Sequence, residues 1–434
     1  MEHSYDAVVI GAGIIGTAVG FELSKRGWKT LNIDSLPAAG YGSTGASCAI
    51  IRVHYSTLDG CAFAYEGYHY WKQWKEYLNI TNDIPIAKFV ECGCMVYQTP
   101  LNNFLRTILE RADQLSIPYL RWNPKDIQQR IPITCTNSFS PAKSLDDLNF
   151  GQPNSTEIHG AIFFPTAGYI NDPQLSAQNI QDAAKKLGAN FRFNTTVNDI
   201  VKNNGRATGV CLSTGEIINA KVVVNVAGPH SMKINSMAGA ETDMKVNTRA
   251  LKVEVAHVPS PIGFNYEHDA FVISDSDIGC YSRPEIGNHI LIGSEDPECD
   301  KRIFVDPDDW DDNFSDQWKT QVYRQAQRYK DLPVSSPLKG VVSLYDVSDD
   351  WMPIYDKSCI PGFYMACGSS GNQYKNGPVA GNLMAGLIEY CETGNDHDRN
   401  PFQFHLKNID YDLNTAVMSR LRTINTESSF SVLG

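Results

Sequence analysis

The sequence has too few basic residues for a polyanion-binding protein and no apolar run long enough to cross a membrane. Its 37 Lys and Arg are outnumbered by 49 Asp and Glu, and the formal net charge of -12 argues against nucleic acid or an anionic membrane as a partner. No segment approaches the roughly 20 consecutive apolar residues of a transmembrane helix. Residues 1–6 are mildly polar and do not resemble a secretory signal. We therefore expect a cytoplasmic protein.

The 11 cysteines lack the spacing of a disulfide framework, a redox motif or a zinc site. Cys92 and Cys94 form a Cys-x-Cys pair, whereas redox motifs and paired zinc ligands have two intervening residues. The simpler interpretation is that the cysteines are small buried hydrophobic side chains kept reduced. We expect no metal site.

Apolar periodicity predicts alternating strands and helices, and hence an α/β protein. A strand over 5–10, a helix over 13–25 and a strand over 30–33 form a predicted βαβ unit. Further helices are predicted over 63–78, 101–115, 172–187 and 378–390, and β-rich segments over 191–226 and 250–294.

The predicted turn between the first strand and helix reads Gly11-Ala12-Gly13-Ile14-Ile15-Gly16, which fits G-x-G-x-x-G. Glycines are needed there for a tight turn, for a backbone close to a pyrophosphate and for close helix–strand packing. Asp34 follows at the end of the next strand, where an acid binds a ribose hydroxyl. The alternative is a merely structural glycine turn. Since there is no second fingerprint, the motif favours one dinucleotide, either FAD or NAD.

Four further segments resemble the FAD-dependent amine and amino-acid oxidoreductases of the D-amino acid oxidase, glycine oxidase and sarcosine oxidase type. They are a Gly- and Ser-rich loop that leads to an arginine (42–52), an apolar strand with an Ala-Gly turn (223–229), the stretch 345–354 and the loop 368–375. The resemblance extends to about Leu387. It implies an FAD enzyme.

The resemblance also implies where FAD lies. The loop that ends at Lys375 precedes a predicted helix, whose N-terminus offers N–H groups to the negative charge of reduced flavin. Gln373 stands where glycine is common in the family. The expected cofactor-binding residues are Gly11, Gly13, Ile14, Ile15, Gly16, Asp34, Ser35, Gly42, Ser43, Thr44, Ala46, Ser47, Val197, Ala227, Gly228, Gly368, Ser370, Gly371, Asn372, Gln373, Tyr374 and Lys375.

These signals lie at the beginning, middle and end of the chain, so we expect a discontinuous Rossmann-like FAD-binding domain with a second domain inserted in it. The FAD-binding domain is assigned 1–60, 155–235 and 340–395, and an α+β, sheet-based substrate domain is assigned 61–154 and 236–339. Residues 396–434 form a C-terminal extension, whose polar, Ser-rich part from 407 fits an appended tail or an oligomer contact.

Arg52 and Lys375 are the expected substrate-binding residues, because family members hold the substrate carboxylate with an arginine and a lysine at the matching positions. A buried carboxylate is costly unless it is paired and hydrogen-bonded. The alternatives are surface charges or neutralisers of the pyrophosphate. Anchoring the carboxylate would direct the α-hydrogen to flavin N5, and hydride transfer would need no obligatory protein base.

Three other residues are weaker candidates for the catalytic pocket. His54 would accept the amine proton, although a histidine is more often structural. Tyr281 and Arg283 are expected to line the pocket, with a sheet aromatic and a sheet-edge ion pair as the alternatives.

Two family features are missing from the sequence. Leu291 stands where some members carry a lysine that activates oxygen, which favours a dehydrogenase slightly over an oxidase. Arg249 and Lys252 are possible substitutes for that cation. Ser343 stands where some members attach FAD through a cysteine, so we expect non-covalent FAD.

The sequence therefore predicts FAD-dependent oxidation of the C–N bond of an amino acid or N-substituted amino acid, with O₂ or another electron acceptor. One alternative is a flavoprotein that oxidises a hydroxy substrate, such as a glycerol-3-phosphate dehydrogenase-like enzyme. Aromatic hydroxylases and halogenases usually carry a Gly-Asp motif that is not evident here. A non-catalytic electron-relay subunit is the alternative outside enzymes.

Overall fold

The glycine-rich start of the chain folds as the predicted βαβ unit. In the computed structural model, β1 (Ser4–Ile10) and β2 (Thr30–Ile33) pair in parallel and α1 (Ile14–Lys25) connects them. The structure describes residues 4–81, 84–334 and 336–433. Residues 1–3, the start of the segment that does not resemble a secretory signal, lie outside the described residues. Within those ranges, no helix has the length and apolarity needed to cross a bilayer.

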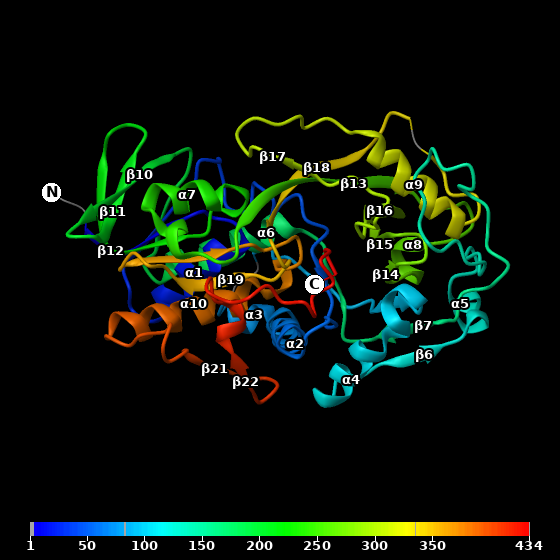
Figure 1. Ribbon diagram of the computed structural model, residues 1–434, viewed down its shortest axis with the longest axis horizontal. Helices are drawn as coiled ribbons and strands as arrows, with labels where there is room; N and C mark the ends of the chain where they lie inside the picture. The colour runs from blue at the N-terminus through cyan, green and yellow to red at the C-terminus, as the bar shows by residue number, and fades with distance from the viewer. Residues whose placement is uncertain (1–3, 82–83, 335, 434) are drawn as a thin grey trace.

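An eight-stranded sheet forms the first lobe and draws on separate parts of the chain (Figure 1). Its order is β10-β11-β12-β1-β2-β9, with β20 beside β12 and β19 beside β20. The added strands are β9 (Asn190–Arg192), β10 (Val197–Asn203), β11 (Arg206–Leu212), β12 (Ile217–Asn225), β19 (Ile354–Lys357) and β20 (Phe363–Cys367).

Helices cover both faces of this sheet. Ala7 and Val9 of β1 pack in one apolar cluster with α1, α6 (Pro173–Lys186) and α10 (Gly377–Glu392). The alternate β1 residues 8 and 10 pack in a second cluster with α7 (Ser231–Ala238). Burial on both faces explains why the parallel strands are nearly continuous apolar runs.

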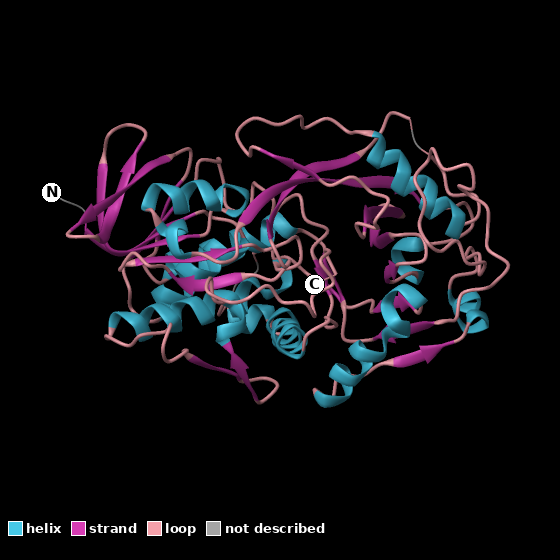
Figure 2. Cartoon of the chain, in the orientation of Figure 1, coloured by secondary structure: helices cyan, strands magenta, loops and turns pink. Residues whose placement is uncertain are grey.

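A nine-stranded sheet forms the second lobe, and Figure 2 shows its strands beside the helices of that lobe. Its order is β17-β13-β16-β15-β14-β5-β7-β6, and β18 also pairs with β13. These strands are β5 (Cys94–Tyr97), β6 (Leu120–Trp122), β7 (Ala161–Phe164), β13 (Thr248–Pro259), β14 (Val272–Asp275), β15 (Cys280–Glu285), β16 (His289–Ser294), β17 (Ile303–Val305) and β18 (Gly340–Ser348).

Smaller elements complete the lobes. The apolar face of α9 (Asp316–Arg328) packs on the nine-stranded sheet through Trp318 and Val322. The other elements are the three-stranded sheet of β3 (Ile50–Ile51), β8 (Gly168–Ile170) and β4 (Phe89–Val90), and the helices α2 (Leu58–Lys72), α3 (Trp74–Tyr77), α4 (Arg106–Gln114), α5 (Pro124–Arg130) and α8 (Tyr266–Asp269).

The structure confirms the predicted α/β class. It breaks the helix predicted over 63–78 at Gln73, between α2 and α3, and begins the helix predicted over 101–115 as a 3₁₀ turn. The predicted domain boundaries stay a prediction. Two strands from ranges assigned to the FAD-binding domain, β7 and β18, pair within the nine-stranded sheet.

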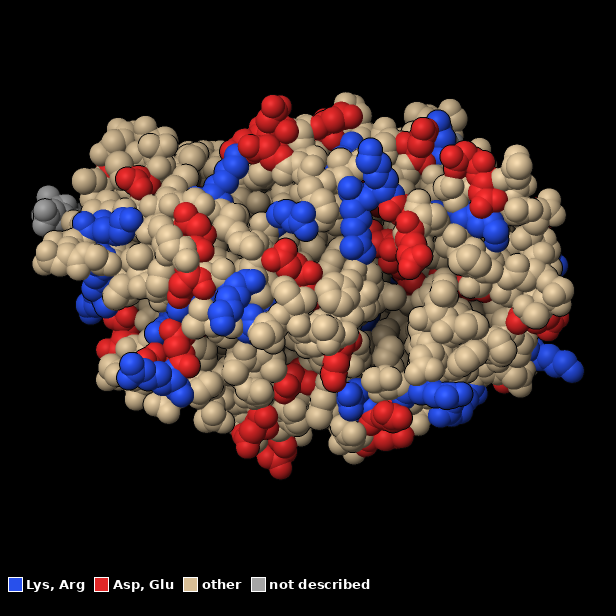
Figure 3. Space-filling view, in the orientation of Figure 1, with Lys and Arg blue, Asp and Glu red and all other residues tan. Residues whose placement is uncertain are grey.

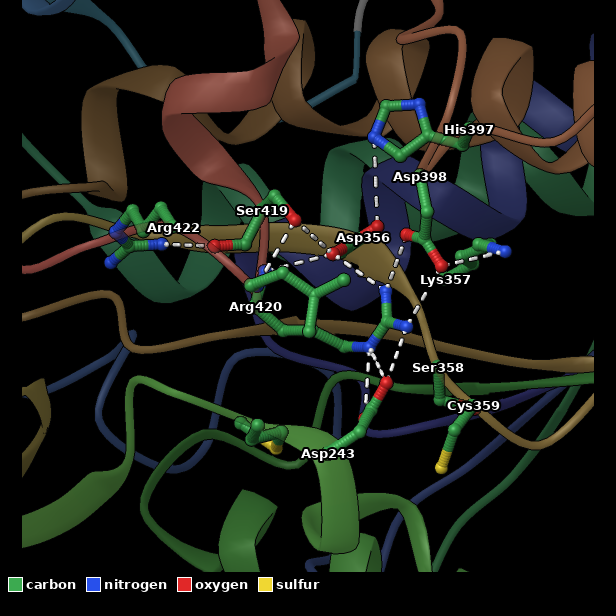
Figure 4. Close-up of polar contacts among 12 residues, drawn as sticks. Asp243, Asp356, Lys357, Ser358, Cys359, His397, Asp398, Ser419, Arg420 and Arg422 are labelled. Atoms are coloured by element: carbon green, nitrogen blue, oxygen red, sulfur yellow. Dashed lines mark hydrogen bonds and ion pairs between the residues drawn. The ribbon is translucent and has the colours of Figure 1, made fainter.

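The C-terminal segment is part of the fold as far as residue 433, which corrects the expectation of an appended tail from residue 407. The hairpin of β21 (Gln403–Leu406) and β22 (Tyr411–Asn414) lies on α2, where the Tyr411 hydroxyl donates to Asp59. The prediction from its polar residues overlooked two buried arginines, which anchor the segment through ion pairs. Arg420 binds Asp243, Asp356 and Asp398 (Figure 4). Arg422 binds Asp350.

Arg420 provides a test of this anchor. Its side chain is 1% exposed, and Arg420→Met would leave the fully buried Asp356 without its cation. Breaking a buried pair from one side costs about 3–5 kcal/mol. We expect the apparent free energy of unfolding in urea to fall by that order.

The control is Lys319→Met, which breaks an exposed pair with Asp316 and costs at most ~1 kcal/mol. Equal, small losses in the two variants would contradict an anchoring role for Arg420.

Candidate active site

A groove runs along the first lobe from the start of α1 to the loop after β20. Its lining combines the two glycine-rich loops with strands of the long β13–β18 ladder. It is lined by Gly13, Ile14, Ile15, Gly16, Ser43, Thr44, Ala46, Ser47, Cys48, Val226, Gly228, Pro229, Val253, Val255, Val341, Ser343, Leu344, Tyr345, Asp346, Ala366, Ser369, Gly371, Gln373 and Tyr374.

The geometry of the first turn requires glycine. Gly11 has φ +113°, and a Cβ there would lie 2.2 Å from the carbonyl oxygen of Val226. A Cβ at Gly16 would lie 2.4 Å from the carbonyl oxygen of Gly11. The turn thus packs closely on the end of β12, and the start of α1 lies at the groove, where the Ile14 N–H donates to the Thr44 hydroxyl at 3.0 Å. A helix N-terminus so placed suits a diphosphate, and the residues present fit the dinucleotide they were expected to hold.

Asp34 lies where the fingerprint places it, just after β2. Its carboxylate accepts hydrogen bonds from the N–H groups of Ala12, at 2.7 Å, and Leu36, at 2.9 Å. Burial raises the pKa of this carboxyl, although both hydrogen bonds oppose the shift. Asp34 holds the glycine turn against β2 and does not itself line the groove.

The predicted cofactor residues divide into three groups: those that line the groove, those that line an adjoining pocket, and those that line neither. The groove is lined by Gly13, Ile14, Ile15, Gly16, Ser43, Thr44, Ala46, Ser47, Gly228, Gly371, Gln373 and Tyr374. Asn372 and Lys375 line an adjoining pocket, and the groove lining does not include Gly11, Asp34, Ser35, Gly42, Val197, Ala227, Gly368 or Ser370. Val197 is instead buried in the apolar cluster around Ile33.

Sequence reasoning missed the part of the groove that β13 and β18 contribute. Val253 and Val255 line it from β13, and Tyr345 and Asp346 from β18. Buried Asp346 accepts a hydrogen bond from the Gly368 N–H at 2.6 Å, and burial raises its pKa to about 7. Asp346 therefore fixes the start of the second glycine loop. The resemblance to the FAD-dependent oxidoreductases included residues 345–354, but no local sequence pattern showed which residues of the paired strands β13 and β18 face the groove.

Arg52 and Lys375 line the adjoining pocket, which shares Cys48, Tyr345 and Tyr374 with the groove. Arg52 follows β3, and Lys375 lies in the 3₁₀ turn before α10. The structure thus brings the two residues to one pocket.

Arg52 is 7% exposed, and within the described residues its guanidinium donates to three carbonyl oxygens. Nη1 donates to His54 at 2.6 Å, and Nη2 donates to Val432 at 2.9 Å and Leu433 at 2.5 Å. The guanidinium also lies over the Tyr55 ring, 4.1 Å from its centroid.

The Lys375 side chain is 3% exposed. Its Nζ donates to the Tyr55 hydroxyl and to the Asn372 carbonyl oxygen, both at 2.6 Å. Burial and the charge of Arg52 hold its pKa well below the usual range. Across the described ranges, no carboxylate lies within 4.0 Å of Arg52 or Lys375. The pocket therefore holds two basic side chains that form no ion pair with a described residue.

His54 and Tyr281 are also brought to this region. The His54 ring is 3% exposed, is stacked on Phe164, and has no hydrogen-bond partner at either nitrogen. Burial and the charge of Arg52 lower its pKa well below the usual range, so the ring is neutral. Tyr281 lines the pocket, with its hydroxyl 3.7 Å from the Cys48 sulfur.

Other residues weighed from the sequence lie elsewhere. Arg283 pairs with Glu285 at 2.9 Å within β15, an interior strand of the nine-stranded sheet, and lines neither groove nor pocket. Arg249 lies over the Phe304 ring, and Lys252 donates to the carbonyl oxygen of Asn313 in the loop before α9. Leu291 packs beside the groove in a small apolar cluster, and Ser343 lines the groove.

Known proteins resemble this chain over most of its length. The beta subunit of sarcosine oxidase from Rhodobacter capsulatus is 26% identical over 398 residues, which covers 88% of this chain and 84% of that protein. Glycine oxidase from Geobacillus kaustophilus is 24% identical over 402 residues, 91% of this chain and 96% of that protein.

Solved structures share the fold at lower identity. The crystal structure of the Geobacillus kaustophilus glycine oxidase superimposes with a TM-score of 0.73 at 20% identity and covers 98% of this chain and 100% of that one. L-proline dehydrogenase from P. horikoshii also gives 0.73 at 20% identity, with coverages of 97% and 98%. The sequence model of the FAD dependent oxidoreductase family matches residues 6–387. Since this match spans most of the chain, the protein belongs to the FAD dependent oxidoreductase family, and the expected FAD-dependent enzyme is confirmed.

Proposed function

We propose that the protein oxidises the C–N bond of an amino acid or N-substituted amino acid, by hydride transfer to its FAD. The observation that carries this proposal is the pair Arg52 and Lys375, buried beside the cofactor groove without a carboxylate partner among the described residues. A substrate carboxylate would supply the missing negative charge. The names of the relatives, which include a sarcosine oxidase subunit, glycine oxidase and L-proline dehydrogenase, agree with this class.

In this proposal, each residue of the pocket has one task. FAD, when bound, supplies the electrophile that accepts the hydride. Arg52 and Lys375 bind the carboxylate, and the bound anion favours the protonated form of Lys375. Two contacts to one carboxylate fix the direction of the α-hydrogen. Neutral His54 has one ring nitrogen with a lone pair and no partner among the described residues, and this nitrogen can accept a hydrogen bond from the substrate amine.

The first prediction concerns Arg52. Hydrogen bonds to charged groups contribute about 1.5–3 kcal/mol, so Arg52→Met should weaken the apparent affinity for the substrate by about ten- to hundredfold. The measurement is bleaching of the flavin by D- and L-amino acids and N-methyl amino acids under anaerobic conditions.

Arg249→Met is the matched control, because this arginine lies over Phe304 outside the groove and pocket. If no compound bleaches a flavin that dithionite still reduces, a hydroxy substrate or a relay subunit replaces the proposal.

The C-terminal segment 428–433 already uses the groups that the carboxylate needs. Its carbonyl oxygens at Val432 and Leu433 accept from Arg52, and Arg302 holds the carbonyl oxygen of Phe430 at 2.6 Å. A carboxylate that binds the Nη2 donors of Arg52 must displace these two carbonyl oxygens.

The second prediction follows from this competition. Deleting residues 428–434 keeps the Arg420 and Arg422 anchors and should tighten the binding of acetate severalfold, as measured by perturbation of the flavin spectrum. Ser429→Ala, which leaves both carbonyl contacts in place, should bind acetate like the full chain. Unchanged or weaker binding after the deletion would show that the segment does not compete.

The third prediction concerns the electron acceptor. Leu291 stands where some family members carry the lysine that activates oxygen, and no described lysine, arginine or histidine is among the residues that line the groove itself. We expect the reduced enzyme to recolour more slowly in air than with an artificial quinone acceptor. Equal rates in stopped-flow mixing would instead identify an oxidase.

A further inference from the structure

A large cavity of about 980 Å³ extends from Arg52 away from the groove. It is lined by Arg52 and His54, by Ser274 and Ser276 in and after β14, and by residues 295–299 after β16. Figure 3 shows a hollow between the two lobes on this face of the molecule, with charged side chains around it. A substrate held at Arg52 therefore has room for a long side chain.

Glu295 lies in this cavity, directly after β16, and is 5% exposed. Its carboxylate oxygens accept from the hydroxyls of Ser274, at 2.5 Å, and Ser276, at 3.1 Å. No lysine, arginine or histidine nitrogen of the described chain lies within 4.0 Å of it. A buried carboxylate with only two neutral donors is poorly compensated, and burial raises its pKa to about 7.

The other acidic residues that line the cavity are either more exposed than Glu295 or lie next to a basic side chain. Asp296 is less buried than Glu295, and Glu427 lies 4.0 Å from Arg111. The charge of Arg52 also acts on Glu295, but from more than 4.0 Å away. Glu298 is exposed to solvent, where water compensates its charge. Glu295 is therefore the acid of this cavity that is both buried and unpaired.

A second observation indicates that this cavity receives a polar ligand. Both nitrogens of the buried His54 ring lack a hydrogen-bond partner among the described residues, and His54 lines the same cavity as Arg52 and Glu295. A buried polar atom without a partner is costly, and a ligand with polar groups would remove that cost at His54 as well as at Glu295.

We propose that Glu295 binds a positively charged group at the end of the substrate opposite its carboxylate, so that the substrate is an amino acid with a basic side chain. This inference rests on the proposed function, because it takes the carboxylate to be held at Arg52. An ammonium or guanidinium group donates to the carboxylate while Ser274 and Ser276 keep their hydrogen bonds. The two ends of such a substrate complement the two unpaired charges of the cavity.

The test compares two amino acids that differ only at the far end. Lysine carries an ε-ammonium group, and norleucine has the same carbon chain without it. We expect lysine, as one of its enantiomers, to reduce the flavin anaerobically with an apparent affinity about tenfold or more above that of norleucine, since the added contact is charge-assisted. 2-Aminoadipate, with a negative end, should bind worst.

Glu295→Gln is the matched variant, because it keeps the shape and can still accept from the serines. We expect it to remove the preference for lysine over norleucine. Glu298→Gln, which alters an exposed acid of the same cavity, should keep the preference and so exclude general electrostatic attraction.

Each outcome has one meaning. If norleucine reduces the full-length enzyme as well as lysine does, or if Glu295→Gln keeps the preference, the role of Glu295 is overturned while the proposed function stands. If none of the three amino acids reduces the flavin, and none of the wider panel does either, the proposed function itself fails. The comparison of lysine with norleucine uses the unaltered enzyme, so it does not depend on whether a variant folds.

Discussion

The structure depends on the burial of two basic side chains, Arg52 and Lys375, whose charge no described acid cancels. Taking such groups out of water is costly, and here backbone carbonyl oxygens and the Tyr55 hydroxyl satisfy their hydrogen bonds without neutralising them. An anion that displaces the C-terminal carbonyl oxygens from Arg52 would supply the missing negative charge. Because the same pocket adjoins the FAD groove, an anion bound there is held beside the redox centre.

Segments that are distant in the sequence build this arrangement. The glycine turn of β1 and α1 and the loop after β20 come from the first lobe, and the β13–β18 ladder adds one wall of the groove. Asp346 ties that ladder to the second glycine loop through the Gly368 N–H. Arg420 and Arg422 bind the C-terminal segment to buried acids, which brings residues 432 and 433 to Arg52. Burial of charge therefore organises both the pocket and the segment that closes on it.

Much of the fold could be predicted, because its signals are local. The Gly11–Gly16 turn, the flanking strands and the α6 helix follow from glycine spacing and apolar periodicity within short windows. The meeting of Arg52 with Lys375 came from the resemblance alone, since nothing local relates two residues so far apart. The contact of Arg52 with Leu433, the groove wall at Val255 and the position of Glu295 depend on strand pairing and long-range packing, for which the sequence has no local pattern.

The central claim is that the charge of a substrate carboxylate, held at Arg52 and Lys375, is what the pocket recognises. The most direct measurement takes the amino acid that bleaches the flavin fastest under anaerobic conditions and compares it with its own methyl ester. The ester keeps the amine, the side chain and the α-hydrogen and lacks only the negative charge. We predict that the ester bleaches the flavin far more slowly, through weaker binding. An ester that bleaches the flavin as fast as the amino acid would contradict recognition of the carboxylate by Arg52 and Lys375.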